Sequence, residues 1–158
     1  MKKTLLALSC AFIFMTGCAS TPPIANTATR GLLICQANEL CPIVTVAWNE
    51  SSKDRLKVKM SLNSTYTKYN IQKVILTDGV NKHSFNVTDL TEMDVAFGAN
   101  RSRNSVIIPV SIMDDFNSSK EVKMEIYTDQ GVISRYVLKD NVKAPVFEEL
   151  LKVYKKSA

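Results

Sequence analysis

The stretch that decides the fold is Arg55-Leu56-Lys57-Val58-Lys59-Met60-Ser61-Leu62, in which polar and apolar residues alternate without interruption. Successive side chains of a β-strand point to opposite faces of a sheet, so alternation of period two places the apolar side chains on one face and the polar ones on the other. The pattern predicts a strand over residues 55–62 with one buried and one solvated face.

The same alternation recurs in other parts of the chain. It is clear over residues 106–112 and 122–127, and the second of these segments is joined through Thr128-Asp129-Gln130-Gly131 to a partner at 132–138. Gly131 is free to take a positive φ there, as hairpin turns require. Weaker strands are expected at 43–49, 71–77 and 83–87, with Trp48 in the core.

The number and spacing of these segments indicate the fold class. Seven short strands with almost no helical periodicity between them predict a mainly β protein, an antiparallel β-sandwich of immunoglobulin-like or transthyretin-like type. The order of the strands cannot be read from the sequence.

A C-terminal amphipathic helix is the exception to this pattern. Over residues 145–156 the apolar side chains follow helical spacing, and Pro145 suits the first turn. Two interpretations are open. Either Val146, Leu150 and Val153 pack on the sheets, which we favour because so short a helix needs tertiary packing, or Phe147, Leu151 and Tyr154 bind a partner.

The N-terminal segment has the layout of a secretory signal. Lys2 and Lys3 precede an apolar run that is shorter than the roughly 20 residues needed to span a bilayer. The run closes on Met15-Thr16-Gly17-Cys18, which resembles the lipobox of bacterial lipoproteins, with Met15 in place of the usual Leu. The resemblance implies cleavage by signal peptidase II after Gly17, a diacylglycerol thioether on Cys18, and acylation of the new amine by a chain such as palmitate. An ordinary cleaved signal with an incidental Cys18 is the alternative.

These features divide the chain into three segments: a signal peptide at 1–17, a lipidated flexible tether at 18–30, and a single sandwich domain at 31–158. Several acyl chains on one residue give stable membrane anchoring. In the lipoproteins that the lipobox resembles, Asp after the modified Cys favours the inner membrane, whereas Ala19 and Ser20 follow here. The resemblance therefore implies an outer-membrane location, and we expect the domain to face the periplasm.

The cysteines are expected to form one disulfide. Cys10 leaves with the signal and Cys18 would carry lipid, so Cys35 and Cys41 remain for an oxidising compartment. Two free thiols are the alternative. A zinc site is a poor rival because His83 is the only histidine and lies far along the chain.

Catalytic chemistry is sparse in this sequence. His83 lies in a predicted hairpin strand without a nucleophile motif, so an enzyme would need a pocket that gathers His83 with Asp89 or Asp94. Of the 20 Lys and Arg, two leave with the signal, and the net charge of +3 that remains against 15 acidic residues is dispersed. We therefore expect no catalytic residue, metal, cofactor, nucleic acid or small-molecule substrate.

Residues 88–104 form the least regular stretch, and long irregular loops in compact domains are often functional. Here Phe97 is the candidate anchor for a partner, and Arg101 and Arg103 are the candidate charges, since aromatic residues and Arg are enriched at interfaces. A core-covering crossover with solvated arginines is the alternative.

These observations lead to a function hypothesis of the binding class. We expect a non-enzymatic lipoprotein of the outer membrane that binds an envelope protein or supports envelope structure. The alternative is an inhibitor or immunity lipoprotein that binds an incoming hydrolase or toxin. A surface adhesin and an enzyme are the remaining classes.

Overall fold

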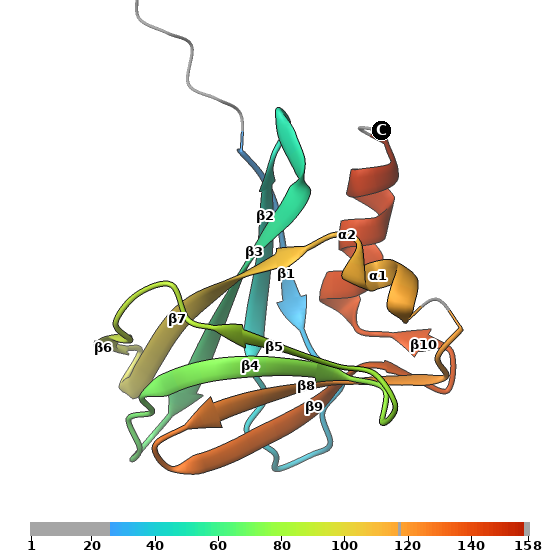
Figure 1. Ribbon diagram of the computed structural model, residues 1–158. Coiled ribbons are helices and arrows are strands. Elements are labelled where there is room, and N and C mark those ends of the chain that lie inside the picture. The colour runs from blue at the N-terminus through green and yellow to red at the C-terminus, as the bar shows by residue number, and fades with distance from the viewer. Residues whose placement is uncertain (1–25, 117, 157–158) are drawn as a thin grey trace, which may run out of the picture.

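The computed structural model describes residues 26–116 and 118–156, which form two five-stranded antiparallel sheets and two helices (Figure 1). The first sheet has the order β1 (Asn26–Leu32), β2 (Ile43–Asn49), β3 (Ser52–Ser64), β7 (Ala99–Pro109), β6 (Glu92–Ala96). The second has the order β10 (Val142–Lys143), β9 (Gly131–Lys139), β8 (Glu121–Thr128), β4 (Ile71–Thr77), β5 (Lys82–Asn86). Helix α1 (Ile112–Asp115) links β7 to β8, and helix α2 (Pro145–Lys156) follows β10.

The core lies between the two sheets, as the alternation in β3 predicts. Leu56, Val58, Met60 and Leu62 are all buried, whereas the residues between them are exposed or half-buried. Trp48 on β2 is also buried. Burial of apolar side chains on the inner faces of both sheets is the main source of stability for such an arrangement.

Every segment predicted from alternation contains a strand, and the structure adds β1, β6 and β10. The strand predicted over residues 106–112 is too long at its end, because β7 ends at Pro109 and Ile112 begins α1. Strand β1 corrects the predicted tether, because residues 26–30 are paired with β2 in the register Asn26↔Asn49 to Leu32↔Ile43. Its sequence, NTATRGL, shows no apolar alternation, so its pairing depends on backbone hydrogen bonds to β2. Residues 18–25 of the tether, like the signal and Cys18, lie outside the described residues.

Residues 88–104 are also more regular than predicted. Strands β6 and β7 form a hairpin in which Phe97 and Gly98 make the two-residue turn, with φ of 51° and 77°. The sequence conceals the N-terminal part of β7, residues 99–105, because Ser102 and Asn104 are polar residues at buried positions. The Ser102 hydroxyl accepts a hydrogen bond from the Tyr69 N–H at 2.9 Å, and the Asn104 amide donates to the Asp89 carbonyl at 3.0 Å.

Helix α2 spans the predicted residues and packs against β1. Val146 and Leu150 are buried, as the favoured interpretation of the helix requires. The contact with β1 is close because Gly31 has no side chain: a Cβ there would lie 2.8 Å from the Val146 nitrogen. The side chains of Val153 and Tyr154 lie outside the described part of the chain.

Candidate functional site

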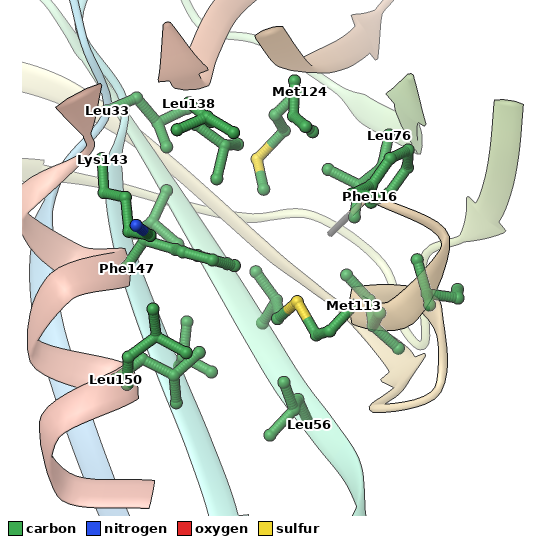
Figure 2. Close-up of a pocket in the computed structure, with 18 of the residues that line it drawn as sticks. Leu33, Leu56, Leu76, Met113, Phe116, Met124, Leu138, Lys143, Phe147 and Leu150 are labelled. Carbon is green, nitrogen blue, oxygen red and sulfur yellow. The ribbon is translucent and has the colours of Figure 1, made fainter. Parts of the chain in front are cut away.

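An apolar cavity of about 430 Å³ lies between the sheets (Figure 2), on the side of the molecule where both helices lie (Figure 1). The first sheet contributes Val58 and neighbouring inner-face residues of β2, β3 and β7, and the second contributes Leu76, Met124 and residues of β9. These are the same inward-facing positions that build the core elsewhere. The cavity is therefore a part of the core in which the two sheets do not fill the space between them.

The two helices form opposite walls of this cavity. Met113 of α1 and Phe116, which follows it, lie on one side, while Phe147, Leu150 and Leu151 of α2 lie on the other. In Figure 2 the side chains of Phe147 and Met113 point toward one another across the space. Phe147 and Leu151 were the candidate partner-binding face of α2, and the structure instead places them on the cavity wall.

The polar side chains in the lining are few. Among the twenty lining residues only Ser119, Asn141 and Lys143 are polar, and Lys143 is the one with a charge. Asp140 and Asn141 have φ of 50° and 66°, which makes a tight two-residue turn that directs the short strand β10 back along β9. Lys143 is exposed, and no described carboxylate lies within ion-pair distance of its ammonium group.

The predicted disulfide is confirmed and lies close to the cavity wall. Cys35 and Cys41 are bonded, with their Cα atoms 5.8 Å apart. Both sulfur atoms lie 3.6 Å from the carbonyl oxygen of Leu33, a lining residue. The disulfide thus fixes the connection between β1 and β2 where it passes the cavity.

Asp78 connects the β4–β5 turn to the segment before β8. Its carboxylate accepts hydrogen bonds from the Ser119 hydroxyl at 2.6 Å and from the N–H groups of Val80 and Asn81 at 2.9 and 2.6 Å. These donors, Ser119 foremost, lower the pKa of Asp78 to about 2. Because Ser119 also lines the cavity, this bond holds one side of the cavity in place.

The predicted interface charges, Arg101 and Arg103, are ion-paired within the β6–β7 hairpin. Arg101 donates two hydrogen bonds to Asp94, from Nε at 2.8 Å and from Nη2 at 2.6 Å. Arg103 Nη2 lies 3.1 Å from Asp94 and 3.3 Å from Glu92, and Glu92 also pairs with Lys59. The hydrogen bond to Arg101 lowers the pKa of Asp94 and raises that of Arg101. The arginines thus brace the hairpin across neighbouring strands.

Phe97 stands at the tip of the same hairpin and is fully exposed, at 107% of its reference area. Leu90, Met93 and Val95 are exposed apolar neighbours in sequence. Because side chains alternate along a strand, Met93 and Val95 lie on the face of β6 opposite to Glu92 and Asp94. One face of the hairpin is therefore charged and self-paired, and the other carries Met93 and Val95 opposite the uncharged polar residues Ser102 and Asn100.

The structure does not bring His83 together with Asp89 or Asp94. The His83 Nε2 atom lies 3.0 Å from the Asp115 carboxylate, and the His83 ring stands edge-on to Phe116. Asp94 belongs to the ion pairs of the hairpin. Among residues 26–116 and 118–156 no group of three or more His, Cys, Asp or Glu side chains is placed to hold a metal ion.

Neither helix in the described part of the chain has the length and apolar character needed to cross a bilayer. Comparison with models of protein families, with curated proteins and with solved structures finds no match. Functional inference therefore depends on the chemistry of the two regions described above, the cavity and the hairpin.

The cavity was not predicted from the sequence, although the sequence contains a signal for it. Helix α2 carries two apolar stripes, and one stripe, with Val146 and Leu150, is enough to pack on β1. The second stripe, with Phe147 and Leu151, indicates a second apolar environment. The sequence could not show that this environment is an internal space shared with α1.

Proposed function

We propose that this chain is a lipid-anchored protein of the outer membrane that binds another envelope protein and catalyses no reaction. The lipobox resemblance supports the anchor on Cys18 and the periplasmic location. We further propose that the two sheets form a sandwich of immunoglobulin-like or transthyretin-like type. The binding role is supported chiefly by one observation, the complete exposure of Phe97 at the tip of the β6–β7 hairpin.

Phe97 has properties of an interface anchor. An exposed phenylalanine contributes nothing to the core of its own domain, and burial of one ring in a partner removes a large apolar area from water. Its φ of 51° is unfavourable for a residue other than glycine, so the hairpin must hold it in place. The bidentate pair between Arg101 and Asp94 stiffens the hairpin behind it. Arg101 and Arg103 thus act as positioning residues and Phe97 as the contact.

Strand β6 supports the same proposal. It is an edge strand of its sheet and, among the described residues, pairs with β7 alone. A free strand edge can pair with a strand of another chain. The partner that fits is a protein with an apolar pocket for one aromatic ring beside an extended segment.

The experiment is cross-linking in cells followed by affinity capture and mass spectrometry. Phe97→Ser removes the proposed anchor, and Val80→Ser is the matched control because Val80 is also exposed, at 90%, but in the β4–β5 turn. We expect a stoichiometric envelope protein that is lost with Phe97→Ser and kept with Val80→Ser. A partner that is kept by both variants would contradict the proposal.

The anchor is tested separately. We expect Cys18→Ala to give a soluble or uncleaved product instead of a processed membrane-bound protein. Unchanged membrane fractionation with a normally processed N-terminus would rule out the lipobox interpretation. An inhibitor or immunity role uses the same protruding tip, and it would appear as a Phe97-dependent partner found only when a foreign hydrolase is supplied.

A further inference from the structure

We propose that the cavity between the sheets binds a single acyl chain that ends in an anionic group, with the chain inside and the anionic group at Lys143. This site is separate from the hairpin and does not depend on the protein-binding role of Phe97. It also departs from the expectation that the protein has no small-molecule ligand.

The size and lining of the cavity support an apolar ligand. Its volume of about 430 Å³ lies within the range of roughly 300–1,000 Å³ that is typical of ligand pockets. Protein interiors are otherwise packed with few voids larger than a water molecule. A water molecule in the interior needs polar partners, and a cavity of this lining offers almost none, so an apolar molecule is the occupant that its surface favours.

The side chains that line the cavity favour a flexible chain as the ligand. The walls are mainly branched aliphatic side chains from both sheets, with Met113 and Met124 on different sides. Methionine adapts its conformation to irregular contacts. We therefore expect the site to accept acyl chains of different length and to require no polar group along the chain.

Lys143 gives the site its polarity. It is the only charged residue of the lining, and the β9–β10 turn fixes the strand that carries it. The other two polar side chains are uncharged, and the Ser119 hydroxyl already donates to Asp78. An anionic end group beside the Lys143 ammonium gains an ion pair that a neutral or cationic end group lacks.

The test is photolabelling of the full processed protein in its own membranes. The probe is dodecanoate that carries a diazirine and an alkyne, and the comparison probe has the same chain with a trimethylammonium end. Labelled peptides are identified by mass spectrometry, and half-saturating probe concentrations are compared. Unlabelled dodecanoate and lysophosphatidylglycerol serve as competitors, which distinguishes a carboxylate from a phosphate end group within the same ligand class.

Two substitutions block the cavity from opposite walls. We expect Met113→Trp and Leu151→Trp each to reduce labelling of α1 and α2 about tenfold, because each fills the space that the chain would occupy. Two independent variants separate a blocked site from a misfolded protein, and formation of the Cys35–Cys41 disulfide monitors folding. Labelling that both variants leave unchanged would overturn the proposal.

The polarity is tested with Lys143→Glu, and Lys139→Glu is the control on the same hairpin, since Lys139 stacks on the Tyr136 ring and does not line the cavity. We expect Lys143→Glu to raise the half-saturating concentration of the carboxylate probe by about two- to fivefold and to favour the trimethylammonium probe. Equal responses to the two lysine substitutions would contradict the placement of the end group. Label confined to peptides outside α1, α2 and the inner strand faces would overturn the whole site.

Discussion

The cavity between α1 and α2 and the β6–β7 hairpin are stabilised by different interactions. At the cavity, apolar side chains from both sheets face a space that they do not fill, and its surroundings are fixed by a disulfide and close backbone packing. At the hairpin there is little core, and Arg101, Arg103, Asp94 and Glu92 hold the strands together at the surface. The stability of the cavity region should therefore depend on side-chain volume and on bound apolar ligands. The stability of the hairpin should depend on ionic strength.

The largest change in stability is expected from Gly31→Val, which tests the close packing beside the cavity. The new Cβ would lie 2.8 Å from the nitrogen and 3.0 Å from the Cα of Val146, and backbone cannot move aside as a side chain can. We expect the free energy of unfolding to fall by about 3 kcal/mol. Denaturant titration measures the change, with Ala28→Val at an exposed position of the same strand as control. Equal stabilities for the two variants would show that α2 is not held closely on β1.

The next effect concerns the disulfide. Replacing both Cys35 and Cys41 by Ser should lower the free energy of unfolding by about 2 kcal/mol, because the loop they close is short. Thermal unfolding with and without reductant provides the measurement. The reductant should lower the melting temperature of the wild type and leave the double variant unchanged. A wild type insensitive to full reduction would mean that the disulfide does not stabilise this region.

A smaller effect, which unlike the two preceding ones should depend on salt, is expected in the hairpin. Arg101→Gln removes a bidentate pair whose side chains are 30% and 39% exposed, so solvent screening keeps the loss of stability below that expected for the disulfide variant. The loss should shrink as ionic strength rises. Arg30→Gln is the control, since Arg30 is exposed and forms no ion pair with any described residue. A loss for Arg101→Gln that does not vary with salt would argue against electrostatic bracing.

The pH dependence of Asp78 should give the smallest effect. Its folded pKa of about 2 lies below the usual 3.8, so its contribution to stability is complete above pH 3.8 and is lost as the pH falls toward about 2. Asp78→Asn should therefore flatten the dependence of stability on pH in that interval, and Ser119→Ala should flatten it in part. Thermal unfolding across this pH range measures both, and unchanged slopes would contradict the role assigned to the Ser119 hydrogen bond.

The sequence predicted those elements whose signals are local. Alternation placed β2, β3, β4 and β8, helical spacing placed α2, and the export signal with two remaining cysteines indicated the disulfide. The immunoglobulin-like or transthyretin-like subtype stays a prediction, as do the anchor on Cys18 and the protein partner.

The missed features depend on contacts between distant segments. Strand β1 forms by backbone pairing with β2. The N-terminal part of β7 gave no alternation signal because its buried residues Ser102 and Asn104 are polar and find hydrogen-bond partners far along the chain. The cavity results from the separation of the two sheets and from the placement of α1 and α2 on opposite sides of the space between them, and no sequence pattern encodes either distance. Pairing of Arg101 with Asp94 could have been suspected only after the hairpin register was known.

Hydrogen exchange of the processed protein, with and without dodecanoate, tests most directly whether the two regions are separate. We expect dodecanoate to slow exchange in α1 and α2 and in the inner-facing strands beside them, and to leave residues 92–103 of the β6–β7 hairpin unchanged. Slower exchange in the hairpin with no change in the helices would contradict the division between an acyl-chain cavity and a protein-binding hairpin.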